Sequence, residues 1–289
     1  MKTATTTRSE IMLEGLIDYA GLYPPANLEM QPTVTNWSNF CLSEDNWILG
    51  RLIIPVNRLD EFKQVAVDLL PSGGAEPWQL SVLLPEVSSD VFVEAANTVV
   101  EFNQSNCGAV ANVVEFKASS TSEIDIALSC LHDDIYPFIE LPIDKDPRGL
   151  IASLAGSIAG AKVRTGGISP DLYPSVGNLA RFIHACAISK LQFKATAGMH
   201  HPCRTFNDSV GIHEFGFLAV MYATAAARFC DATIEGIACI LQSEIMDFDA
   251  CTEKMLESVR AELFCSFGSC SFDDPISDLR SMELLQEIR

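Results

Sequence analysis

The feature that most constrains the fold is a repeated alternation between short apolar runs and longer segments with helical periodicity. Residues 51–56 (RLIIPV) form the clearest apolar run, and similar runs recur along the chain, each followed by a segment of helical length. Continuous apolar runs are typical of strands that are covered on both faces. Strands that alternate with helices predict a parallel sheet with right-handed crossovers.

The alternation predicts eight strands and a helix between each pair. We expect the strands at residues 16–22, 51–56, 80–85, 110–118, 136–141, around Lys162, around Lys194 and at 263–268. We expect the helices at residues 8–16, 32–43, 58–70, 88–104, 123–131, 147–159, 174–188, 213–229, 232–262 and 275–288. Eight strand–helix units in about 250 residues are typical of an α/β fold of the (β/α)8 TIM barrel class. An open doubly wound sheet is the main alternative.

No linker or internal repeat interrupts this pattern, so we expect one domain over residues 1–289. The pattern also predicts a helical insertion at about residues 205–262, between the seventh and eighth strands. No leader-like segment is evident at the N-terminus, which favours a cytoplasmic protein. The ten cysteines lack CxxC pairs and are expected to be buried free thiols rather than zinc ligands.

Charge limits the range of partners. The chain has 19 Lys and Arg against 38 Asp and Glu, a formal net charge of −19. Such a chain repels phosphate backbones, so we expect no nucleic-acid partner. No apolar run is long enough to span a membrane. A small-molecule substrate is therefore the expected partner, with self-association into a homo-oligomer left open.

Two lysines occupy matching places in residues 159–204. Lys162 precedes the turn Thr165-Gly166-Gly167, and Lys194 precedes the turn Thr196-Ala197-Gly198. Side chains alternate along a strand, so Lys162 shares a face with Arg164, and Lys194 shares a face with Thr196. Active sites of TIM barrels lie at the C-terminal ends of the strands, where these residues would meet.

Close approach of the lysines would favour reaction with a carbonyl. Nearby positive charge and desolvation both lower the pKa of a lysine, and a neutral amine forms a Schiff base. Alternatively, one lysine points outward between helices or forms a structural ion pair with Glu140.

Small turns at the strand ends suggest an anion site. Glycine lets the backbone approach a ligand closely, and barrels often bind phosphate after strands seven and eight. The expected contacts are Arg164, Thr165, Gly166, Gly167, Thr196, Gly198, His201, Arg204, Gly268 and Ser269. Plain turn geometry is the alternative for each turn.

These motifs resemble a known family in order and spacing. Residues 162–166 (KVRTG) and 194–198 (KATAG), separated by 194 − 162 = 32 residues, resemble the two lysine motifs of the deoxyribose-phosphate aldolase family. Residues 267–271 (FGSCS) are similar to its phosphate turn, and residues 16–19 (LIDY) and the Ile139-Glu140 strand end follow in the same order. The resemblance implies a class I aldolase-like barrel that needs no cofactor beyond the lysine imine. It implies that Lys162 forms the Schiff base and that Lys194 lowers its pKa.

Several groups are candidates for proton transfer. Glu115 lies on strand four, where the family has an aspartate; Glu140, His200 and Asp18 are the others. The predicted function is thus a Schiff-base-forming lyase acting on a small carbonyl compound, phosphorylated or not.

Two alternatives remain open. His200 or His201, with His213 and Glu140, would form the metal site of a hydrolase or isomerase. The third hypothesis is a barrel that binds a metabolite without catalysis.

Overall fold

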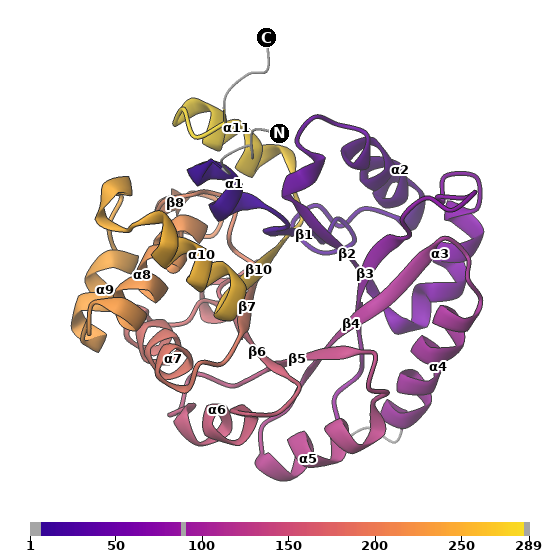
Figure 1. The fold of residues 1–289 in the computed structure, drawn as a ribbon, viewed down its shortest axis with the longest axis horizontal. Coiled ribbons are helices and arrows are strands. Elements are labelled where there is room, and N and C mark those ends of the chain that lie inside the picture. The colour runs from indigo at the N-terminus through magenta and orange to yellow at the C-terminus, as the bar shows by residue number, and fades with distance from the viewer. Residues whose placement is uncertain (1–6, 88–90, 286–289) are drawn as a thin grey trace, which may run out of the picture.

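The computed structural model describes residues 7–87 and 91–285 and shows a closed barrel of eight parallel strands (Figure 1). The strands are β1 (Ile17–Tyr19), β2 (Leu49–Pro55), β3 (Trp78–Leu83), β4 (Ala109–Lys117), β5 (Tyr136–Glu140), β6 (Gly160–Arg164), β7 (Phe193–Thr196) and β10 (Phe264–Ser269). They pair in chain order, and β10 closes the barrel against β1. The (β/α)8 TIM barrel prediction is confirmed, and the open sheet is excluded.

Helices surround the barrel on its outer side, as Figure 1 shows. They are α1 (Arg8–Leu13), α2 (Met30–Cys41), α3 (Leu59–Ala66), α4 (Phe92–Gln104), α5 (Thr121–Cys130), α6 (Arg148–Leu154), α7 (Val176–Ser189), α8 (Phe217–Phe229), α9 (Ile234–Leu241), α10 (Glu253–Glu262) and α11 (Asp273–Ser281). Residues 88–90 of the fourth expected helix and 286–288 of the last lie outside the described residues.

Several helices begin at a side-chain cap. Ser120 before α5, Ser175 before α7 and Thr252 before α10 each accept a hydrogen bond from the backbone N–H three residues later. Such caps satisfy N–H groups that have no partner within the helix. The capping side chains therefore fix the residue at which each of these three helices begins.

The segment between β7 and β10 differs from the expected one. It begins with an antiparallel hairpin of β8 (Thr205–Asn207) and β9 (Ile212–Glu214), so the helix expected from residue 213 begins at Phe217. The helix expected over 232–262 is divided into α9 and α10. The Asp247 side chain accepts from the Asp249 N–H between these helices, and the Thr252 side chain accepts from the Met255 N–H at the start of α10. Both bonds favour a break in the helix.

The structure also bears on the membrane and cysteine predictions. Within the described ranges, none of the helices is both long and apolar enough to cross a bilayer. All ten cysteines are free thiols, as expected. The expectation that they are buried is wrong for most of them: Cys186 and Cys251 are buried, whereas Cys230 and Cys239 are exposed.

Strand register brings the key residues level. Lys162 on β6 pairs with Lys194 on β7, and Arg164 pairs with Thr196. On the other side of β6, Lys162 pairs with Glu140 on β5. Because paired residues of neighbouring strands lie at the same height, the two lysines and Glu140 are at one level of the barrel.

Candidate active site

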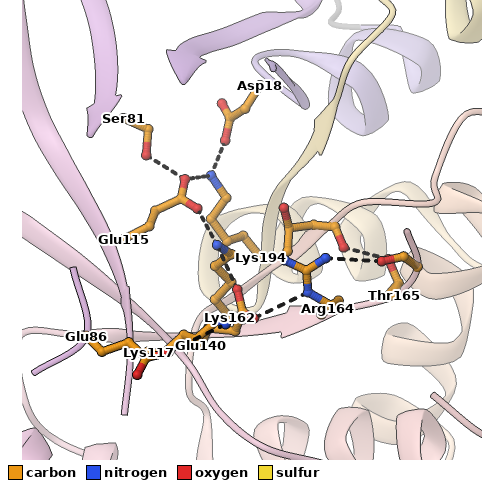
Figure 2. A network of polar contacts seen from close by, with 12 residues as sticks. Asp18, Ser81, Glu86, Glu115, Lys117, Glu140, Lys162, Arg164, Thr165 and Lys194 are labelled. Carbon is orange, nitrogen blue, oxygen red and sulfur yellow. Dashed lines mark hydrogen bonds and ion pairs between the residues drawn. The ribbon is translucent and has the colours of Figure 1, made fainter. Parts of the chain in front are cut away.

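Six charged side chains, linked by ion pairs, form a row across the barrel interior that we call the charged chain. It runs Asp18, Lys194, Glu115, Lys162, Glu140, Arg164 (Figure 2). The carboxylates come from β1, β4 and β5, and the cations come from β6 and β7. Positive and negative groups alternate along it. A buried charge is tolerated when it is paired and hydrogen-bonded, and each inner member of this chain has two opposite neighbours.

Lys194 lies at the enclosed end of this chain. Its Nζ donates to Asp18 Oδ2 at 2.6 Å and to Glu115 Oε1 at 2.5 Å, and its side chain is 1% exposed. Asp18 is fixed in turn by Ser266 Oγ at 2.7 Å and by the Arg51 backbone N–H at 2.7 Å. Lys194 is thus a buried cation with a fully organised set of acceptors.

Lys162 lies next in the chain and is slightly more open. Its Nζ is 2.9 Å from Glu115 Oε2 and 2.9 Å from Glu140 Oε2, and its side chain is 7% exposed. Arg164 Nε lies 3.5 Å from Glu140 Oε1. The predicted pairing of Glu140 with Lys162 is confirmed. Glu115 bridges the two lysines, because each of its oxygens faces a different Nζ.

The pKa values of the two lysines differ in direction from the expectation. Burial lowers the pKa of Lys162, but Glu115 and Glu140 outweigh it and raise that pKa above its ordinary value. Burial likewise lowers the pKa of Lys194, but Asp18 and Glu115 outweigh it, so the pKa of Lys194 is also raised. The prediction that repulsion between the lysines lowers their pKa values is therefore wrong for the structure described, because carboxylates lie between and beside the ammonium groups.

The carboxylates show the complementary effect. Burial raises the pKa of Glu115, but Lys194 and Lys162 outweigh it and hold that pKa far below its usual range. The pKa of Glu140 is lowered in the same way, with burial opposing and Lys162 as the main favourable charge. These shifts favour charged ammonium groups at Lys162 and Lys194 and charged carboxylates at Glu115 and Glu140.

A cavity of about 310 Å³ opens at the C-terminal ends of the strands, beside Lys162. The predicted site residues that line it are Glu115, Lys162, Arg164, Gly167, Thr196, Gly198, His200 and Gly268. Lys194 lies beneath this lining, behind Glu115. Lys162 is therefore the lysine that a ligand in this cavity would meet.

The turns after β6 and β7 form one wall of the cavity. Thr165 Oγ1 donates to the carbonyl oxygens of Thr196 at 3.2 Å and Ala197 at 2.5 Å, which ties the two turns together. A Cβ added at Gly166 would lie 2.7 Å from the Cα of Gly198, so glycine is required for this close approach. Thr165 and Gly166 shape the wall without lining the cavity.

Other predicted contacts lie elsewhere. Arg204 Nη1 donates to the Gln242 carbonyl at 3.3 Å, and His201 Nδ1 lies 2.6 Å from Asp278 Oδ2. Ser269 is buried and accepts from the Ser271 N–H. These three residues are not among those lining the cavity beside Lys162: Arg204 bonds the end of α9, His201 bonds α11, and Ser269 is buried at the end of β10.

The histidines do not assemble as the metal hypothesis requires. His201 pairs with Asp278, and His213 Nε2 lies 3.7 Å from Glu244 Oε1. Glu140 is held by Lys162. Within residues 7–87 and 91–285, no group of three or more His, Cys, Asp or Glu side chains is placed to hold a metal ion. Within these residues, the predicted set of His200 or His201 with His213 and Glu140 is not brought together at one place.

His200 lines the cavity wall together with Lys162. Burial lowers its pKa, and the nearby charges of Glu214 and Asp274 act in the opposite direction. A neutral imidazole can accept or donate a hydrogen bond, depending on its tautomer. It is thus available for contact with a ligand but is not part of the charged chain.

Sequence analysis missed two serines that complete this chain. Ser81 on β3 donates to Glu115 Oε1 at 2.6 Å, and Ser266 on β10 donates to Asp18 Oδ2 at 2.7 Å. Both are buried. A serine flanked by apolar residues within a strand was the available signal, since a buried hydroxyl requires a partner.

Fold and site together define a (β/α)8 barrel with a buried lysine–carboxylate chain whose Lys162 end opens into a cavity. Comparisons of the chain with protein-family models, with curated proteins and with solved structures find no match. The case for a function therefore depends on the geometry of this site.

Proposed function

We propose that this protein is a lysine-dependent lyase of the aldolase type, acting on a small carbonyl compound through an imine at Lys162. The observation that carries the proposal is the placement of Lys162 between Glu115 and Glu140 at the inner wall of a cavity of about 310 Å³. Nucleophilic lysines need proton acceptors within hydrogen-bonding reach, and Lys162 has two.

The charge of the site suits this chemistry. An ammonium group and a carbonyl give a protonated imine and water, so one positive charge is present at the start and at the end. Two of the three Nζ protons leave with the carbonyl oxygen as water, and Glu115 or Glu140 can carry them. The carboxylates that raise the pKa of Lys162 would therefore also stabilise the protonated imine.

Lys194 would have a supporting role. Because it stays charged and holds Glu115 Oε1, it orients the other oxygen of Glu115 toward Lys162. Arg164, whose side chain is 40% exposed, lines the same cavity and would bind an anionic end of the substrate, such as a phosphate.

One observation favours a second candidate, a barrel that binds a metabolite without catalysis. Both lysines are neutralised by carboxylates in the resting state, which is also the arrangement of a structural ion network. The two candidates differ in whether Lys162 forms a covalent bond with a carbonyl.

Borohydride trapping separates the two candidates. The protein is incubated with acetone, glycolaldehyde, pyruvate or glyceraldehyde 3-phosphate, reduced with borohydride and weighed by mass spectrometry. We expect a stable adduct with at least one probe and its loss in Lys162→Met. Lys63→Met, which removes a lysine of α3 from the protein surface, is the matched control and should label like the wild type. No adduct with any of the four probes would favour the binding barrel.

A further inference from the structure

Tyr23 lies in the loop after β1 and forms part of the cavity wall, together with Lys162 and Glu115. Its backbone is fixed on both sides: its N–H donates to the Ala20 carbonyl at 2.9 Å, and its carbonyl accepts from the Asn27 N–H at 3.0 Å. The sequence motifs give this residue no role.

The hydroxyl of Tyr23 is buried and makes no hydrogen bond with any group in residues 7–87 and 91–285. Three other tyrosine hydroxyls have protein partners: Tyr19 with Asn36, Tyr173 with Glu214 and Tyr222 with the Phe248 carbonyl. Buried polar groups are nearly always hydrogen-bonded, and one without a protein partner destabilises the fold. Within the described residues the hydroxyl has no partner, and the cavity that Tyr23 lines is the place from which a ligand could supply one.

We propose that Tyr23 is a further catalytic residue, whose hydroxyl donates a hydrogen bond to the substrate oxygen as Lys162 attacks the carbonyl carbon. This inference rests on the proposed function. One Nζ proton first passes to Glu115 or Glu140, which leaves Lys162 as a neutral amine. The Lys162 nitrogen then forms the C–N bond, and the π electron pair of the carbonyl moves to the oxygen. Tyr23 stabilises the negative charge that develops there and keeps its own proton. The oxygen then takes two protons that began on Lys162 and leaves as water.

The electrostatics of the wall agree with a donor that stays protonated. Burial raises the pKa of Tyr23, and the charge of Glu115 raises it further, while Arg58 opposes them weakly. A phenol with a raised pKa remains a hydrogen-bond donor across the physiological range. Glu115 also disfavours negative charge on Tyr23, so the hydroxyl acts by hydrogen bonding rather than by releasing its proton.

The test compares Tyr23→Phe with Tyr173→Phe, which removes a tyrosine hydroxyl that has a protein partner at 2.7 Å. Each protein is trapped with the same four carbonyl probes, and its urea unfolding midpoint is measured. For Tyr23→Phe we expect trapping about 100-fold slower, as for loss of one donor to a developing oxyanion. We expect its midpoint to be unchanged or higher, because an unpaired buried hydroxyl is removed. Tyr173→Phe should show a lower midpoint.

The outcomes separate this inference from the proposed function. Equal trapping rates in Tyr23→Phe and the wild type would overturn the inference and leave the lyase proposal standing. A clearly lower midpoint in Tyr23→Phe would also overturn it, since the hydroxyl would then have a structural partner. No trapping in the wild type would overturn both proposals.

Discussion

Replacing Lys162 with methionine tests how much the charged chain stabilises the fold. Methionine keeps most of the side-chain volume and removes the cation that faces Glu115 and Glu140 at 2.9 Å. Glu140 would keep Arg164, which is 3.5 Å away and 40% exposed, and the more distant charge of Lys117. Breaking a buried ion pair by removing one partner costs about 3–5 kcal/mol. Since Glu115 keeps Lys194 and Ser81, we expect the lower end, about 3 kcal/mol.

The loss of stability should depend on pH in a defined direction. Lys162 helps to hold the pKa of Glu140 below its ordinary value. A carboxyl whose pKa is lower in the folded than in the unfolded state adds stability above the unfolded value, about 4.3, and that stability disappears as the pH falls. Lys162→Met removes this contribution. The difference in unfolding free energy between wild type and variant should therefore be largest above about pH 5 and shrink toward pH 3.

The assay is urea unfolding followed by tryptophan fluorescence at pH 7 and pH 4, since Trp37 and Trp78 are buried. The double variant Lys162→Met/Glu140→Gln should recover about 1–2 kcal/mol, because the unpaired carboxylate becomes neutral. Lys63→Met is the control: its pair with Asp60 lies at the surface, with side chains 35% and 85% exposed, and is worth about 0–1 kcal/mol. A loss below about 1 kcal/mol for Lys162→Met at pH 7, or a loss that is the same at both pH values, would refute the reasoning.

Two further predictions concern the lysines and the packing around Asp18. Lysine titration can be followed by ¹³C NMR of Cε, with resonances assigned by Lys→Arg variants. The raised pKa values of Lys162 and Lys194 predict no titration of either below about pH 10.4. Titration of either lysine near neutrality would contradict the charged chain. A Cβ added at Gly50 would lie 2.3 Å from Asp18 Oδ1, so Gly50→Ala should destabilise by about 1–3 kcal/mol in urea unfolding. Gly149→Ala, at a helical glycine with open space around it, should instead stabilise by about 0.5–1 kcal/mol; equal effects at the two sites would argue against this packing.

The barrel and the level of its lysines were readable from the sequence. Apolar runs separated by helix-length segments predicted all eight barrel strands, because a strand covered on both faces is rich in apolar residues. The placement of Lys162 and Lys194 just before small turns predicted that they meet at one level, and their register pairing confirms it. Short-range sequence patterns suffice to predict this barrel because it is built from repeated βα units.

The protonation state of the site was not readable in the same way. Asp18, Glu115 and Glu140 were each candidates, but periodicity gives only the face on which a side chain lies. Whether a carboxylate comes between two lysines depends on atomic distances set by barrel closure, and at those distances attraction outweighs repulsion and burial. Glu115 bridges both lysines because β4 faces them across the interior.

The hairpin and the Tyr23 hydroxyl were missed for different reasons. β8 and β9 have three residues each, too few to show an alternating pattern. That the Tyr23 hydroxyl has no partner among the described residues is a property of the packed wall and has no sequence signal.

The most direct test of the account is to locate the reduced carbonyl adduct within the chain by peptide mapping. Lys162 faces the cavity, and Lys194 lies behind Glu115 with a 1% exposed side chain. The account predicts that the adduct is on Lys162 and that a Lys194→Arg variant is labelled at the same position. An adduct on Lys194, or one spread over surface lysines with Lys162 unmodified, would contradict it.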